Sequence, residues 1–291
     1  MKKVFLFVAL LCTAQIAMGQ SALSRSRPTP TPPPRVEVYA IANDGTQLQW
    51  TVYTPPGKGP WPAVLVIHGG LFRDGSFADP GVVPCAQDLA NAGYVAFAIN
   101  YRLAPPGSLP GQRSLGRSPD QYNDVHLAVQ AARDDSRSNG QVGAVGGSAG
   151  GTHAVWVAAT GTAGADRLDV GVSLSGAYDF SDFTPDPELA LFIATVTNYV
   201  GVPSTNTAAL RAASPAWVVN NTVSPLLLVQ TVGDLMPAAQ FADMVAQLNA
   251  HGVRNYTAMT ISGALHSFEY WPQIKSTALA FLASGFAGRT H

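Results

Sequence analysis

The sequence predicts an α/β fold: a doubly wound, mostly parallel sheet that begins with an antiparallel hairpin. Apolar runs typical of strands buried on both faces alternate with helical patterns, and alternating polarity marks the first two strands. Right-handed crossovers are expected between the parallel strands. We find no internal repeat. The predicted buried strands lie at 63–67, 94–99, 142–145, 170–174 and 226–230, and a further apolar segment lies at 256–261.

Two segments, 36–41 and 47–53, predict the hairpin because their residues alternate between polar and apolar. They flank Asn43-Asp44-Gly45, and an Asp-Gly step favours the tight turns that join antiparallel strands. The continuous apolar runs begin only at residue 63. We therefore expect the antiparallel pair at the start of an otherwise parallel sheet.

Helical patterns fill the segments between the later strands, as a doubly wound sheet requires. The second of them is expected to end near Asn139-Gly140, since glycine favours helix termination. The patterns span 86–92, 122–133, 152–159 and 238–250.

Two insertions interrupt this alternation. One is the Pro/Gly-rich stretch 103–119, and the other is a cap-like stretch at about 179–224. Both follow strands, and ligands in such sheets bind outside the carboxyl ends of the strands. Both insertions are therefore expected to shape a pocket, so that acyl and alcohol preferences would depend on their conformation.

Residues 1–19 are typical of a secretory signal peptide, with two lysines, a short apolar run and small residues before a cleavage point after Gly19. The run is too short to span a membrane, which takes about 20 residues. A proline-rich linker at 20–35 and a single domain at 36–291 follow. We expect a secreted or periplasmic chain without an integral membrane span after cleavage. Cys85 would then be its only cysteine, so no intramolecular disulfide is expected.

The charge composition favours no charged macromolecule as a partner. The chain has 17 Lys and Arg against 18 Asp and Glu, a formal net charge of -1, and only 12% charged residues. This balance gives no electrostatic reason to bind nucleic acid or an anionic membrane surface. It indicates an uncharged or weakly charged ligand. The sequence carries no signal for the oligomeric state.

Gly146-Gly147-Ser148-Ala149-Gly150-Gly151 fits the pattern G-x-S-x-G. In a nucleophile elbow a strand ends, the chain turns sharply into a helix, and the serine sits at the turn with its hydroxyl exposed. A predicted strand precedes this stretch and a predicted helix follows it. The alternatives are an ordinary Gly-rich turn or a phosphate-binding loop, but the lysine of a phosphate-binding loop is absent. The pattern favours Ser148 as a nucleophile.

A serine nucleophile needs a histidine base and an acid that orients the imidazole ring. Of the six histidines, His266 lies in the loop after the last predicted strand, where this chain order delivers the base. Asp234 follows the strand at 226–230 and lies between Ser148 and His266 in sequence. Asp179 follows the preceding strand and stays open as the alternative acid. The other histidines are terminal, at or inside predicted helices, or in the motif described next.

The tetrahedral oxyanion of acyl transfer needs preorganised N–H donors. The amide of Ala149, directly after the candidate nucleophile, is one candidate. The amides of Gly70 and Leu71, supported by Gly69, are the others, since they follow the first parallel strand and glycine permits a close backbone approach. His68 begins this loop and has no second metal-type ligand spaced near it. No metal and no organic cofactor is implied.

With these residues in place, the chain resembles the α/β-hydrolase superfamily. Within it, the chain is similar to secreted bacterial esterases near the hormone-sensitive-lipase-like and feruloyl-esterase-like (carbohydrate esterase) branches. The resemblance covers nearly everything after Arg35. It rests on the loop 68–76, on Asn100-Tyr101-Arg102-Leu103-Ala104-Pro105, on the serine motif, and on the Ser-Pro pairs 214–215 and 224–225.

The resemblance implies the α/β-hydrolase fold for the domain at 36–291 and a secreted serine carboxylesterase that acts through an acyl-enzyme. Small or short-chain esters, among them acetyl or feruloyl esters of plant polysaccharide, are the implied substrates. Leu71 stands where the lipase-like branch has glycine, so it is expected to keep its N–H with an ordinary φ. In related enzymes a proline more often follows the acid by four residues, whereas Pro237 follows Asp234 by three.

Two other functions are the alternatives. A serine peptidase or amidase of the same fold would show an acidic pair for a substrate amino terminus or an added propeller domain, and neither is visible. A non-catalytic binding module would have lost a member of the triad, whereas all three candidates are present. Function follows from the site and not from the fold, so the esterase interpretation rests on the triad.

Overall fold

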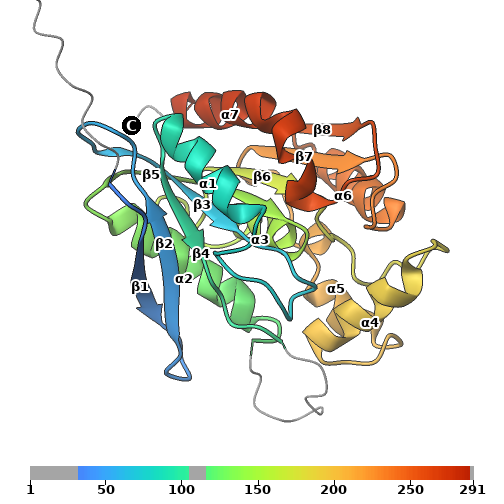
Figure 1. The fold of residues 1–291 in the computed structure, drawn as a ribbon. Helices are drawn as coiled ribbons and strands as arrows, with labels where there is room; N and C mark the ends of the chain where they lie inside the picture. Colours follow the sequence, from blue (N-terminus) through green and yellow to red (C-terminus); the bar gives the residue numbers. More distant parts are fainter. Residues whose placement is uncertain (1–31, 105–115, 289–291) are drawn as a thin grey trace, which may run out of the picture.

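The computed structural model describes residues 32–104 and 116–288. Its centre is an eight-stranded sheet in the order β1-β2-β4-β3-β5-β6-β7-β8 (Figure 1). β1 pairs antiparallel with β2, β2 pairs antiparallel with β4, and all later neighbours are parallel. The predicted fold class is confirmed. The strands are β1 (Arg35–Ile41), β2 (Gln47–Tyr53), β3 (Trp61–Ile67), β4 (Val95–Ile99), β5 (Ser138–Gly147), β6 (Val170–Leu174), β7 (Leu226–Thr231) and β8 (Tyr256–Ile261).

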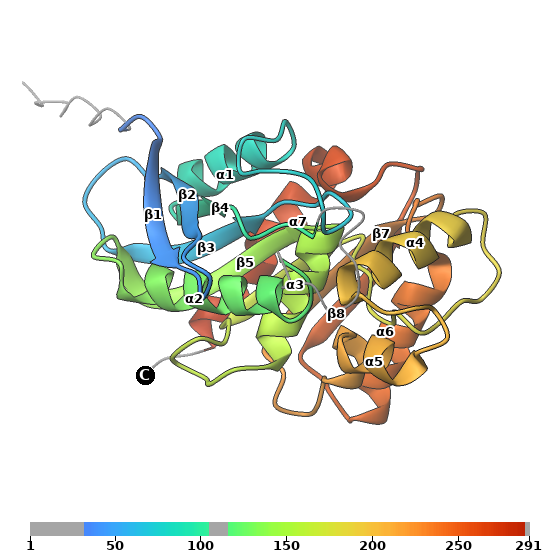
Figure 2. The same ribbon diagram turned by 90° about the horizontal axis from the view of Figure 1, so that it is seen from below.

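Helices cover both faces of the sheet, so its central strands are buried on both sides (Figure 2). α1 (Val82–Asn91) and α7 (Trp271–Ala287) pack on one face. α2 (Asp120–Asp134), α3 (Ala149–Ala159) and α6 (Ala238–Ala250) pack on the other. Central strands such as β3 and β4 are therefore apolar at successive positions, because each side chain meets a helix on one face or the other.

The predicted element boundaries differ most from the structure at two places, and elsewhere by up to three residues. α1 begins at Val82, four residues before the predicted start, because Pro84 falls in the first helical turn, where its missing N–H costs no hydrogen bond. Asn139-Gly140 does not end α2, which stops at Asp134. The pair lies in β5, which begins at Ser138 opposite Trp61 and is longer than the apolar run that predicted it.

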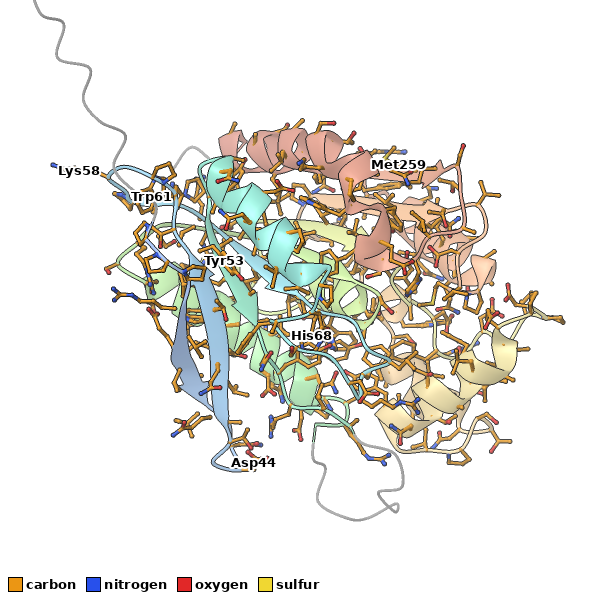
Figure 3. All side chains as sticks on the ribbon, in the orientation of Figure 1. Asp44, Tyr53, Lys58, Trp61, His68 and Met259 are labelled. Atoms are coloured by element: carbon orange, nitrogen blue, oxygen red, sulfur yellow. The ribbon has the colours of Figure 1, made fainter. Side chains whose placement is uncertain are left out.

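The insertion predicted at 179–224 forms α4 (Leu189–Val200), α5 (Thr207–Ala212) and a short 3-10 helix, η1 (Pro215–Trp217). In Figure 1 it lies beyond the carboxyl ends of the parallel strands. Side chains of α4 and α5 form a separate apolar cluster with the loop after β3. Figure 3 shows His68 at that end of β3, with Lys58 and Trp61 at the other.

The predicted signal peptide, most of the predicted linker and residues 105–115 of the other insertion lie outside the described residues. Within the described ranges, no helix combines the length and hydropathy needed to cross a bilayer. Cys85 is buried in α1 as a free thiol.

His153, in α3, is fully buried among aromatic rings, and its Nε2 hydrogen-bonds Gln121 Oε1 at 2.9 Å. Burial, reinforced by the nearby His68, lowers the His153 pKa to about 3. The unfolded chain therefore takes up this proton from about pH 6.5 downward, and the folded protein takes it up only near pH 3. Each pH unit between these values is expected to cost about 1.4 kcal/mol of folding free energy.

Urea unfolding from pH 7.5 to 4.5 tests this expectation. His153→Gln is expected to show a shallower loss of unfolding free energy on acidification than the wild type. His251→Gln, at the exposed carboxyl end of α6, serves as the matched control and should keep the wild-type slope. Parallel slopes for His153→Gln and wild type would contradict the assignment.

Candidate active site

Ser148 lies between β5 and α3 with φ 54° and ψ -121°, a strained backbone conformation for a non-glycine residue. Its amide donates to the Leu174 carbonyl at 2.8 Å, which ties the turn to β6. The turn is tight because Gly146 and Gly150 pack against backbone: a Cβ on Gly146 would collide with the Gly150 carbonyl, and one on Gly150 with the Ile67 carbonyl. These glycines let the chain adopt the geometry of a nucleophile elbow.

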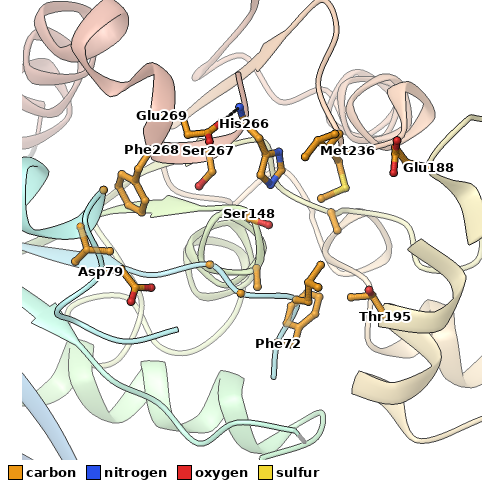
Figure 4. Close-up of a pocket in the computed structure, with 18 of the residues that line it drawn as sticks. Phe72, Asp79, Ser148, Glu188, Thr195, Met236, His266, Ser267, Phe268 and Glu269 are labelled. Carbon is orange, nitrogen blue, oxygen red and sulfur yellow. Dashed lines mark hydrogen bonds between the residues drawn. The ribbon is translucent and has the colours of Figure 1, made fainter. Parts of the chain in front are cut away.

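His266 follows β8 and contacts Asp234, which follows β7. The His266 Nδ1 to Asp234 Oδ1 distance is 2.6 Å, and the Asp234 side chain is only 3% exposed. His266 and Ser148 line one cavity, but no direct hydrogen bond joins the serine hydroxyl to the ring (Figure 4). In unliganded enzymes such hydrogen bonds are often long and tighten when substrate binds.

The Asp234 carboxylate lies in a set of hydrogen-bond donors. Burial raises its pKa, but hydrogen bonds from His266, from the Ser175 hydroxyl (2.6 Å) and from the Met236 amide (2.9 Å) outweigh burial and hold the pKa below its usual value. Asp234 is therefore an ionised acceptor at neutral pH. That is the state needed to support a protonated imidazole.

Asp179, the alternative acid, lies elsewhere. Its Oδ1 accepts from the Ser181 amide and hydroxyl, and its Oδ2 accepts from Trp217 Nε1 at 2.8 Å. None of its hydrogen bonds involves His266. The structure thus brings Asp234, and not Asp179, to the histidine.

The loop after β3 lies directly against the serine turn, since a Cβ on Gly69 would come within 2.9 Å of the Ser148 Cβ. Gly70 has φ 113° and packs against the Asp74 carbonyl, which only glycine accommodates. The expectation of an ordinary φ at Leu71 was wrong: Leu71 has φ 55° and Phe72 has φ 61°. The tight turn, in which the Gly70 carbonyl accepts the amides of residues 73 and 74, imposes this strain.

Gly70, Leu71 and Ala149 line the same cavity as Ser148. Among the described residues, none of the three backbone N–H groups has a hydrogen-bond partner. Free N–H groups beside a serine are the donors that an oxyanion requires.

Side chains of the Asn-Tyr-Arg motif hold this loop in place. The Tyr101 hydroxyl donates to the His68 carbonyl at 2.9 Å, and the two rings stack. Arg102 forms a buried ion pair with Asp124 at 2.8 Å, which ties the motif to α2. Gln121, also on α2, donates to the Phe72 carbonyl at 2.7 Å. These contacts therefore hold the strained loop in one conformation, as a preorganised site requires.

Sequence reasoning missed Ser175. This residue follows β6 with φ 54° and is 2% exposed. Its hydroxyl proton goes to Asp234 Oδ2, since a carboxylate can only accept, and its oxygen accepts from the Ser267 amide at 3.0 Å. The Tyr270 hydroxyl lies 2.9 Å from the same oxygen. The Gly-Ala-Tyr-Asp stretch at 176–179 marked this strand end in the sequence, but nothing there singled out the serine before it.

Ser175→Ala is expected to lower kcat about 10-fold with little change in KM, because Asp234 would lose a charge-assisted hydrogen bond that orients it. The pKa of Asp234 would also rise in this variant, since a hydrogen-bond donor to its ionised form is removed. Steady-state kinetics across pH measures both effects. Ser173→Ala is the matched control, because this buried hydroxyl on β6 bonds Tyr178 and not Asp234. Equal losses in both variants would contradict a positioning role for Ser175.

A cavity of about 750 Å³ opens over Ser148 between the insertion and the loops after β3, β7 and β8. Most of its wall is apolar and includes Phe192 and Val196 of α4 and Trp271 of α7. Within the two described ranges, no group of three or more His, Cys, Asp or Glu side chains could hold a metal ion.

A model of the BD-FAE family matches residues 51–248. No curated protein sequence matches the chain. Among solved structures, the chain is similar to a truncated form of a carbohydrate esterase from gut microbiota, with a TM-score of 0.71 and 16% identity over 86% of this chain and 96% of that one. It is similar to Thermogutta terrifontis esterase 2 phosphonylated by sarin (TM-score 0.68, 19% identity, 88% and 95% covered). It is also similar to a bifunctional GH43-CE from Bacteroides eggerthii (TM-score 0.68, 18% identity), covering 85% of this chain but 34% of that one.

Proposed function

The chain belongs to the BD-FAE family, and from this premise we propose that it is a secreted serine carboxylesterase that hydrolyses small or short-chain esters through an acyl-enzyme. The observation that carries the proposal is the 2.6 Å contact between His266 and Asp234 in the cavity that holds the strained Ser148. A nucleophile, a base and an orienting acid are the parts that acyl transfer needs.

In the proposed acylation, the Ser148 hydroxyl attacks the ester carbonyl. Nδ1 of His266 is hydrogen-bonded to Asp234, so Nε2 is the nitrogen that takes the serine proton. The amides of Gly70, Leu71 and Ala149 stabilise the oxyanion, and the imidazolium gives its proton to the departing alcohol. Water then attacks the acyl-serine by the same route in reverse, which releases the acid and restores the serine.

A carbohydrate-linked ester is the substrate we propose first. Two of the similar structures are described as a carbohydrate esterase and as a GH43-CE, and the export signal predicted at residues 1–19 suits an extracellular substrate. The short-chain preference is supported by the propionate-bound structure of Thermogutta terrifontis esterase 2, to which the chain is 21% identical. Acetylated sugars and feruloyl esters are therefore the substrates to assay beside simple aryl esters.

Paired substrates test the reaction type. The purified protein is expected to hydrolyse 4-nitrophenyl acetate and butyrate at least about 100-fold faster than the matching 4-nitroanilides, because amides are less reactive and the described cavity lining shows no feature for an amine leaving group beyond the triad. Turnover of the anilides at an equal or higher rate would favour an amidase. Failure to turn over any ester would refute the proposed function.

A further inference from the structure

We propose that the cavity over Ser148 selects uncharged or cationic esters and rejects esters that carry an anionic group on either the acyl or the alcohol side. The inference rests on the proposed function, since it describes the substrate class of the same site. It is carried by the charges and the apolar wall of this cavity.

Among the residues that the structure describes, the charged side chains of the cavity wall, apart from the candidate base, are carboxylates. Asp79, Glu188 and Glu269 line the cavity, and no lysine or arginine of the ranges 32–104 and 116–288 does. In Figure 4, Asp79 and Glu188 lie on opposite sides of Ser148. A substrate that extends to either side of the serine therefore meets a carboxylate.

Within the described part of the chain, these carboxylates have no cationic partner. None of the three forms an ion pair with a described residue. Asp79 accepts from the amide and hydroxyl of Ser76, and Glu269 accepts from the His266 amide at 2.8 Å. Hydrogen bonds from neutral donors leave the negative charge in place, so the field in the cavity is negative.

The rest of the wall strengthens this field. Leu191 and Phe192 of α4, close to Glu188 in the sequence, line the cavity together with Leu235 and Met236 of the loop after β7. An anionic group placed there would lose hydration without gaining a partner. Because apolar walls exclude water, its repulsion from the carboxylates would also be weakly screened.

Three 4-nitrophenyl esters of similar acyl size test the acyl side: the pentanoate, the monoglutarate and the 4-(trimethylammonio)butanoate. For wild-type protein, kcat/KM for the anionic monoglutarate is expected to be about 10- to 30-fold below that of the neutral pentanoate, and the cationic ester should match or exceed the pentanoate. The gap should narrow in 1 M NaCl. A matched pair of phenyl and 4-carboxyphenyl butyrates tests the alcohol side in the same way.

Variants assign the effect to the wall. Glu188→Gln and Asp79→Asn are each expected to raise the anionic-to-neutral ratio of kcat/KM about 3- to 10-fold for the substrates that extend toward them. Asp134→Asn, an exposed carboxylate at the end of α2 outside the cavity, should leave the ratio unchanged. The ratio is taken within one protein, so loss of folded protein does not affect it.

The two proposals fail in different ways. A wild-type protein that hydrolyses none of the esters refutes the proposed function. A protein that hydrolyses the neutral esters but accepts anionic ones equally well refutes charge selection alone. Charge selection is also refuted if neither Glu188→Gln nor Asp79→Asn changes the ratio.

Discussion

Ser148→Ala is expected to lower kcat/KM for an aryl ester by about 10⁴- to 10⁶-fold. Without the hydroxyl no acyl-enzyme can form, and only binding and oxyanion stabilisation remain. The strained turn itself should persist, because the glycines at 146 and 150 and the Ser148 amide define it. Alanine keeps the Cβ and lacks only the hydroxyl, so the packing of the core should not change. The circular dichroism spectrum and the melting temperature should therefore stay close to wild type.

Ser267→Ala is the matched control for this prediction. Ser267 also lines the cavity and also has a positive φ, of 61°, but among the described residues its hydroxyl makes no hydrogen bond. It should retain most of the wild-type activity. Undiminished turnover in Ser148→Ala, or a loss of equal size in Ser267→Ala, would contradict the role proposed for Ser148.

Asp234→Asn is expected to lower kcat about 10⁴-fold, since an amide in this place favours the wrong imidazole tautomer and does not stabilise the imidazolium. Asp179→Asn should leave kcat nearly unchanged. We expect Asp179→Asn to lower the free energy of unfolding by about 1 kcal/mol instead, because the partners of Asp179, Ser181 and Trp217, belong to the insertion and not to the catalytic cluster. Steady-state kinetics and urea unfolding of the two variants separate these effects. A loss of activity confined to Asp179→Asn would reverse the assignment.

The sequence could predict the fold because its signals are local. Buried parallel strands need apolar residues at every position, and the run at 226–230 therefore matched β7 closely, as the alternating segments matched β1 and β2. Ser148 and His266 were predicted as site residues in the same way, since each lies in the loop that follows a recognisable strand. Chain order and strand ends are enough to bring such residues to one edge of a sheet.

Other features depend on contacts between distant segments. The sequence left Asp179 and Asp234 open as the acid, because both follow strands and only the fold shows which one contacts His266. Ser175 bonds a residue 59 positions away, and no local pattern marks that pairing. The positive φ of Leu71 results from a tight turn held by α2, and the propensity of leucine alone argues against it.

The most direct test of the central claim, that Ser148 is the nucleophile, is the site of covalent labelling by a fluorophosphonate. Intact-mass measurement should show one label per chain, and peptide mapping should place it on Ser148. The labelled fraction should rise over time as ester turnover falls by the same proportion. Ser148→Ala should take up no label. A label on another residue would contradict the account, as would continued ester turnover by fully labelled protein or by Ser148→Ala.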